Sequence, residues 1–149
     1  MPAVTGRRLE DADATLQLGR ELAAVLRHEY RGNACIYLVG ELGAGKTTLC
    51  RGIVQALGHA GPVKSPTYTL LEPYELGDTI VLHADLYRLA FPGELVGAGL
   101  DEALDTGCIR LIEWPDRGEG YLPAPDLTIT LHLAGEARTV DIDVHNTRA

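Results

Sequence analysis

The order of apolar and polar residues along this chain predicts a mixture of helices and strands. Apolar residues recur at helical spacing in three segments, residues 11–28, 48–57 and 92–104. Asp11 or Asp13 can cap the first of these helices at its start, and Gly58 can end the second in a left-handed conformation. The third segment is interrupted by glycines, so we expect a less regular helix there.

Six further segments have the patterns of strands, namely residues 34–39, 68–76, 79–85, 108–114, 127–133 and 140–144. Gly77 and Asp78 predict a hairpin between the second and third of them. The last two alternate apolar and polar residues, which is typical of a half-exposed antiparallel hairpin. We therefore expect a three-layer α/β fold with a mixed, mainly parallel sheet and a C-terminal antiparallel hairpin. Because no repeat or long linker divides the chain, one domain should cover residues 1–149.

Residues 40–48 read Gly-Glu-Leu-Gly-Ala-Gly-Lys-Thr-Thr, a complete G-x-x-x-x-G-K-[ST] phosphate-binding loop. The loop lies between a predicted strand and a predicted helix. In that context the glycines let successive backbone N–H groups point at one anion, and the helix adds the positive end of its dipole. Lys46 is expected to reach the β- and γ-phosphates, and the Thr47 hydroxyl to bind Mg²⁺. The sequence thus predicts a P-loop NTPase-type domain that binds a nucleoside triphosphate.

Magnesium bound with a nucleotide usually has a second anchor, an acidic residue at the end of a neighbouring apolar strand. Asp85 and Glu113 each stand at the end of such a predicted strand. A solvated acid at a strand end, or the cap of a helix, would explain either residue alone.

Residues 64–68 read Lys-Ser-Pro-Thr-Tyr and form the other unusual loop. Pro66 restricts Ser65 to extended conformations, and Ser65 and Thr67 offer hydroxyls. A hydroxyl-bearing loop that senses the γ-phosphate is the switch device of GTPases. An ordinary turn before a strand would account for the same residues.

The formal net charge of −8 argues against direct binding of nucleic acid over most of the surface. Any role in nucleic-acid metabolism is expected to act through a partner or one local patch. Cys35, Cys50 and Cys108 show no metal-ligand spacing, and we expect buried free thiols in a reducing cytoplasm. No apolar run approaches the roughly 18 residues that span a bilayer, and residues 1–9 lack the core of a signal peptide. We therefore expect a cytoplasmic protein without membrane contact.

Four motifs occur in order along the chain: residues 40–48, then Lys-Ser-Pro-Thr-Tyr-Thr-Leu at 64–70, His-Ala-Asp-Leu-Tyr-Arg at 83–88 and Leu-Ile-Glu-Trp-Pro at 111–115. This succession closely resembles the TsaE (YjeE) family of bacterial ATPases over nearly the whole chain. The resemblance implies a role in making threonylcarbamoyladenosine, the modified base beside the anticodon of tRNAs that read codons beginning with adenine. In that family the ATPase acts on a complex of two other proteins, TsaB and TsaD, so tRNA would be reached indirectly.

The resemblance also implies roles for individual residues. Six consecutive residues would bind the phosphates of ATP: Gly43, Ala44, Gly45, Lys46, Thr47 and Thr48. Thr47 and Glu113 would bind Mg²⁺, and Asp85 is similar to the Walker-B carboxylate that supports the metal. Ser65 and Thr67 are similar to the switch hydroxyls, and Trp114 to the aromatic residue beside the site. The adenine would lie near the start of the first helix, where Ala12 occupies a position that is often acidic. Catalysis would then depend on Lys46, Asp85, Glu113 and Thr67.

Three other functions fit the phosphate-binding loop. A small-molecule kinase would usually need an arginine-bearing lid, and residues 86–107 offer little beyond Arg88. A GTPase commonly carries an Asn-Lys-x-Asp loop, and neither Asn33 nor Asn146 is followed by lysine. A nucleotide-dependent binding module, in which hydrolysis is incidental, remains as an alternative to the ATPase.

Overall fold

The computed structural model describes residues 1–63, 66 and 70–145. Within these residues the strands are β1 (Val4–Leu9), β2 (Ala34–Val39), β3 (Leu71–Leu76), β4 (Thr79–Asp85), β5 (Ile109–Glu113), β6 (Leu127–Ala134) and β7 (Ala137–Val144). The helices are α1 (Ala12–His28), α2 (Lys46–Ala56), α3 (Glu94–Gly97), α4 (Leu100–Leu104) and the 3₁₀ helix η1 (Pro115–Gly118). None of the helices in the described part of the chain is long and apolar enough to cross a membrane.

The seven described strands form one sheet in the order β1-β7-β6-β2-β5-β4-β3. At its centre β2 is parallel to β5 and β6, and β4 is parallel to β5. At its margins β1 pairs with β7, β6 with β7, and β3 with β4, all antiparallel. The prediction of an α/β fold with a mixed sheet and a C-terminal antiparallel hairpin is confirmed. Parallel pairing is confined to the central strands, so the described sheet is partly parallel.

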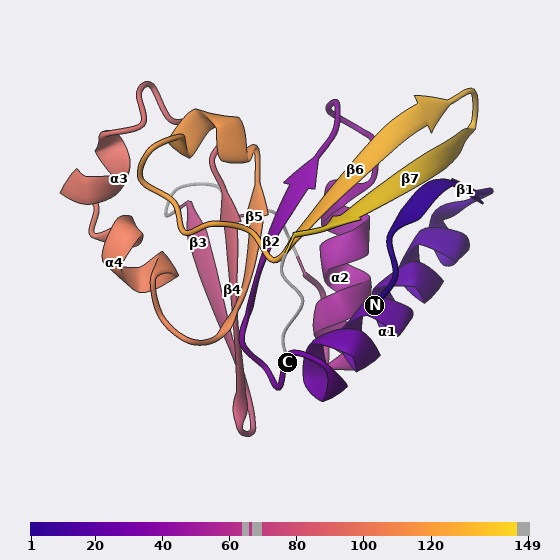
Figure 1. The fold of residues 1–149 in the computed structure, drawn as a ribbon, viewed down its shortest axis with the longest axis horizontal. Coiled ribbons are helices and arrows are strands. Elements are labelled where there is room, and N and C mark those ends of the chain that lie inside the picture. The colour runs from indigo at the N-terminus through magenta and orange to yellow at the C-terminus, as the bar shows by residue number, and fades with distance from the viewer. Residues whose placement is uncertain (64–65, 67–69, 146–149) are drawn as a thin grey trace.

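Side chains from the two faces of the sheet form separate hydrophobic clusters, because successive residues of a strand point to opposite sides. Ile109 and Leu111 of β5 lie in the cluster that includes residues of α1 and α2. Ile112 lies in the other cluster, together with Leu95 of α3 and Leu104 of α4. Figure 1 shows α1 and α2 on one side of the central strands and the short helices α3 and α4 on the other. The fold therefore has three layers.

Helices α1 and α2 approach each other closely at a pair of glycines. A Cβ atom placed on Gly19 would lie 2.8 Å from the backbone of Gly52, and one on Gly52 would lie 2.8 Å from the carbonyl oxygen of Leu16. Each distance is too short for a real Cβ contact, so the two helix backbones pack directly against each other. This contact fixes α2, whose first turn carries Lys46.

Several elements differ from the sequence-based expectation, and three of the differences bear on the site or on the edge of the sheet. Helix α2 begins at Lys46, two residues before the expected start, because the end of the phosphate-binding loop already has helical geometry. The segment predicted as one interrupted helix is two short helices, separated at Gly99, whose φ is +73°. Strand β1 is an addition to the predicted strands, since Gly6 and two adjacent arginines give it no strand pattern. Pairing with β7 holds it in place, and the Gly6 N–H donates to Asp141 Oδ1 at 2.7 Å.

Candidate functional site

The phosphate-binding loop connects the end of β2 to the start of α2, and three of its glycines have backbone conformations that other residues rarely adopt. The φ angles are +154° at Gly40, +80° at Gly43 and +103° at Gly45. A Cβ atom on Gly40 would lie 2.6 Å from the carbonyl oxygen of Leu131, so the loop also needs glycine there for space. Within the described residues no side chain caps the N-terminus of α2. Its first N–H groups and its dipole are thus suited to hold an anion.

A cavity of about 240 Å³ joins this loop to the ends of β4 and β5. Its lining includes most of the residues predicted for the site: Gly43, Gly45, Lys46, Thr47, Thr48, Asp85, Glu113 and Trp114. Ala44, also in the loop, is buried in the hydrophobic core. The predicted switch residues Ser65 and Thr67 lie outside the described residues. The structure therefore brings together three of the four sequence motifs, although they are far apart along the chain.

Lys46 is buried, and two contacts hold its ammonium group at the cavity. Nζ donates a hydrogen bond to the Gly40 carbonyl and lies 3.8 Å from the centroid of the Trp114 ring. Burial lowers the pKa of Lys46, and the nearby carboxylates of Glu113 and Asp85 partly oppose that shift. A phosphate group in the cavity would stabilise the charged form of this buried ammonium group through a charge-assisted hydrogen bond.

The carboxylates of Asp85 and Glu113 lie at the same edge of the sheet because their strands are parallel. The two residues are direct partners across β4 and β5, and Glu113 also pairs with Leu38 of β2. Burial raises the pKa of Asp85, the charge of Glu113 raises it further, and a bond from the Tyr87 N–H opposes the shift. A hard cation placed here would relieve this repulsion. Two carboxylates and the Thr47 hydroxyl in one cavity are the oxygen ligands that suit Mg²⁺.

Glu113 belongs to a buried polar group with His83, a residue of the 83–88 motif for which no role was predicted from the sequence. His83 Nε2 and Glu113 Oε2 are 2.6 Å apart, and the two side chains are 0% and 3% exposed. The Cys50 thiol of α2 completes a group whose possible metal-ligand atoms all lie within 4.8 Å of one another. Burial raises the pKa of Cys50, so the thiol stays protonated, which disfavours it as a ligand. The sequence did contain one indication that His83 lies near the site. His83 and Asp85 are two residues apart on a strand, so their side chains point to the same face of the sheet.

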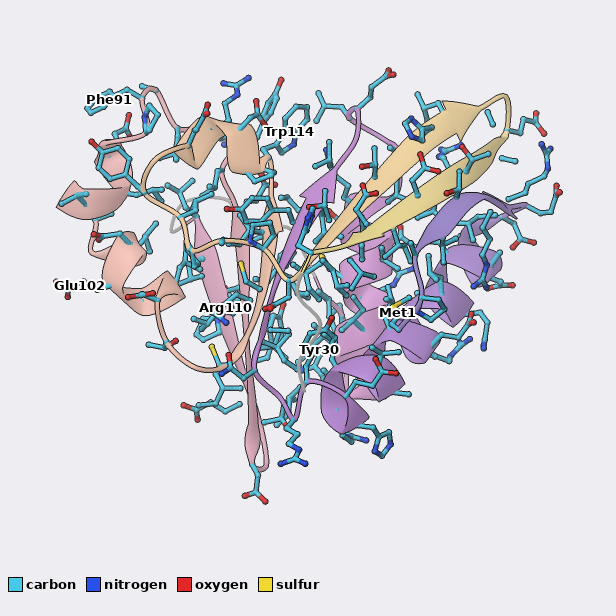
Figure 2. All side chains as sticks on the ribbon, viewed as in Figure 1. Met1, Tyr30, Phe91, Glu102, Arg110 and Trp114 are labelled. Atoms are coloured by element: carbon cyan, nitrogen blue, oxygen red, sulfur yellow. The ribbon has the colours of Figure 1, made fainter. Side chains whose placement is uncertain are left out.

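Trp114 follows β5 directly and has a φ angle of +56°, which is unusual for a residue other than glycine. Its ring lies 4.9 Å from that of Tyr87, centroid to centroid. Figure 2 shows Trp114 beside η1, at the end of the sheet where the phosphate-binding loop also lies. The strained backbone turns the ring over the Lys46 ammonium instead of letting β5 continue.

A smaller cavity of about 140 Å³ lies on the other side of the loop. Its lining includes Ala12 of α1, as well as Gly43, Glu136 and Arg138. Arg138 Nη2 donates to the Gly43 carbonyl at 3.0 Å, so β7 contacts the loop. Nothing in the sequence pattern indicated that contact. Ala12 thus lies next to the loop, at the capped start of α1, where the Ala14 N–H donates to Asp11 Oδ1 at 2.9 Å.

Known proteins resemble this chain in sequence over most of its length. The profile of the family described as "Threonylcarbamoyl adenosine biosynthesis protein TsaE" matches residues 9–140. A Haemophilus influenzae protein is 42% identical over 135 residues, covering 90% of this chain and 85% of its own length. A Rickettsia bellii protein is 36% identical over 126 residues, covering 84% of each chain. Both are named tRNA threonylcarbamoyladenosine biosynthesis protein TsaE.

The fold has a counterpart among solved structures. The crystal structure of Bacillus subtilis YdiB superposes with a TM-score of 0.76 at 27% identity, covering 98% of this chain and 90% of that one. Because the family profile spans most of the chain and the relatives match nearly end to end, the chain belongs to the TsaE family of threonylcarbamoyladenosine biosynthesis proteins.

Proposed function

We propose that this protein is a Mg²⁺-dependent ATPase required for threonylcarbamoyladenosine modification of tRNAs that read codons beginning with adenine. One observation carries the proposal. In a member of the TsaE family, a single cavity joins a complete phosphate-binding loop to two strand-end carboxylates, Asp85 and Glu113. A structural turn would need the glycines but not the buried lysine and the paired acids beside them.

In this proposal the backbone N–H groups of residues 43–48 and the Lys46 ammonium bind the phosphates of ATP. Thr47, Asp85 and Glu113 hold Mg²⁺, which when bound neutralises charge on the phosphates. Ser65 and Thr67 act as switch hydroxyls near the γ-phosphate. The adenine occupies the cavity beside Ala12, where a base could lie between the start of α1 and the C-terminal hairpin.

The partner in this proposal is a TsaB–TsaD-like complex, and tRNA is reached through that complex in the cytoplasm. The net charge of −8 supports indirect action, because an acidic surface repels a polyanion. If one domain covers residues 1–149, as we expect, it would leave the γ-phosphate of bound ATP open to water, so the isolated protein should hydrolyse ATP slowly. Docking on the partner should support residues 64–68 and raise the rate, and ATP should in turn strengthen docking.

A reconstituted modification assay tests the proposal. The reaction contains the TsaB–TsaD-like complex and the other enzymes of the pathway, with tRNA, threonine, bicarbonate and ATP. One arm lacks this protein, and another contains the Asp85→Ala variant. We expect several rounds of threonylcarbamoylation only with the native protein. Equal yields without it, together with an ATPase rate indifferent to the partners, would show the proposal to be wrong.

The reaction with Asp85→Ala also distinguishes the proposed ATPase from the alternative function, a nucleotide-dependent binding module in which hydrolysis is incidental. If Asp85 supports chemistry, the variant should bind ATP but fail to sustain repeated turnover. A variant that has lost hydrolysis and still supports full modification would instead indicate that nucleotide-dependent binding is the function.

A further inference from the structure

We propose that His83 is a positioning residue for Glu113: its ring donates one hydrogen bond that fixes the carboxylate in the orientation required to hold Mg²⁺ with ATP. The proposal rests on the proposed function of the cavity and names a residue outside its lining. His83 itself would touch neither the nucleotide nor the metal.

The geometry follows from the pairing of β4 and β5. In this parallel pair Asp85 is opposite Glu113, and His83 is opposite Leu111. His83 therefore lies two residues behind Asp85 on the same face of the sheet, diagonal to Glu113. The Nε2 atom lies 2.6 Å from Glu113 Oε2, a short hydrogen-bond distance between a ring nitrogen and a carboxylate oxygen.

Burial makes this bond decisive for the carboxylate. The Glu113 and His83 side chains are almost fully buried, so bulk water does not compete for Oε2. A hydrogen bond to one oxygen sets the plane of the carboxylate and hence the direction in which the second oxygen points. Because Glu113 also lines the cavity beside Asp85 and Thr47, that direction decides whether the second oxygen faces a cation held there.

The other ring nitrogen shows that packing alone does not account for the histidine. Among the residues that the structure describes, His83 Nδ1 is the one buried side-chain polar atom without a hydrogen-bond partner. Proteins rarely bury an unpaired polar atom, and an aliphatic residue would fill this volume without that cost. The ring is therefore best explained by the one hydrogen bond that it makes.

The surroundings keep the ring in place. Leu111 lies opposite His83 on β5, and the buried Cys50 thiol of α2 has its sulfur within 4.8 Å of the ligand atoms of both His83 and Glu113. Since α2 also carries Lys46 and Thr47 in its first turn, the same packing joins the phosphate-binding end of α2 to the carboxylate. Outer partners of this kind typically change metal affinity or activity by about 10- to 100-fold when they are removed.

Two variants separate positioning from packing. His83→Leu keeps most of the volume and removes the donor, whereas His83→Gln keeps an N–H donor near the place of Nε2. For each protein we would measure, by calorimetry, the binding of a non-hydrolysable ATP analogue over a series of Mg²⁺ concentrations. Thermal unfolding and ATP turnover with the partner complex complete the set.

We expect His83→Leu to need about 10-fold more Mg²⁺ for half-maximal analogue binding and to lose about 10-fold in kcat, with little change in KM for ATP at saturating Mg²⁺. His83→Gln should recover most of both losses. The proposal is overturned if His83→Leu matches the native protein, or if both variants lose activity only in step with their thermal stability.

The two readouts keep the underlying proposals apart. If the native protein binds the Mg²⁺ complex of the analogue but never hydrolyses ATP, the proposed ATPase function is wrong. The Mg²⁺ dependence of analogue binding would still decide whether His83 positions Glu113. If the native protein binds the analogue equally well with and without Mg²⁺, the positioning role is overturned.

Discussion

Adding one methyl group where α1 meets α2 should destabilise this protein, although the same change stabilises most helices. Gly52 lies inside α2, and a Cβ atom there would lie 2.8 Å from the Leu16 carbonyl oxygen, 3.1 Å from Leu16 Cα and 3.3 Å from Gly19 Cα. All three atoms belong to the backbone of α1. They cannot move aside as the end of a long side chain can, so the helices must separate.

The expected magnitude combines two opposing terms. Replacing a helical glycine by alanine contributes about 1 kcal/mol of stability through helix propensity. Overpacking a tight core costs about 1–3 kcal/mol, and backbone contacts favour the upper part of that range. The net loss for Gly52→Ala should be about 1–2 kcal/mol. For a domain of this size that corresponds to a fall in Tm of about 2–8 °C.

Thermal and urea-induced unfolding would measure the change, with Gly97→Ala as the matched control. Gly97 is the last residue of α3 and is exposed, and a Cβ atom there would have no other atom within 4 Å, so its substitution should leave stability unchanged or slightly higher. Gly52→Ala should also weaken ATP binding, since α2 carries the phosphate-binding loop at its start. A Gly52→Ala protein as stable as the native one would refute the close backbone packing of α1 and α2.

Two further predictions concern the site. Burial and the charge of Glu113 raise the pKa of Asp85, so its carboxyl group binds a proton more tightly in the folded state than in the unfolded state. The free energy of unfolding should therefore fall as the pH rises from the unfolded pKa of Asp85 through its higher folded pKa. Asp85→Asn should therefore stabilise the protein at neutral pH and flatten this pH dependence, whereas equal pH profiles for the two proteins in urea denaturation would contradict it. Trp114 lies against the Lys46 ammonium, so its fluorescence should change when ATP and Mg²⁺ draw that group toward phosphate. A silent signal at saturation would place the phosphates elsewhere.

The parts of the fold that depend on local pattern could be predicted from the sequence. Strand β2, helix α1 and the C-terminal hairpin each carry their own periodicity, and the phosphate-binding loop is specified by glycines at fixed spacing. Strand β1 could not be predicted in this way. Its residues form a strand because they pair with the edge of β7, near the other end of the chain.

The candidate site shows the same division. Asp85 and Glu113 could be predicted from the sequence as acidic residues that bind the metal, because each stands at the end of an apolar strand. The bond between His83 and Glu113 depends instead on the parallel register of β4 and β5, which no local pattern specifies. The contact of Arg138 with Gly43 likewise joins residues 95 positions apart. Ser65 and Thr67 stay predictions, since they lie outside the described residues.

The central claim is that the cavity between the phosphate-binding loop and the strand-end carboxylates binds ATP with Mg²⁺. Calorimetric titration of ATP and Mg²⁺ into the native protein and into Lys46→Ala tests it most directly, with thermal unfolding to show that the variant is folded. Removing a charge-assisted contact typically costs about 1.5–3 kcal/mol, so Lys46→Ala should bind at least about 10-fold more weakly. Near-native affinity in a folded Lys46→Ala protein, or no binding by the native protein, would contradict the claim.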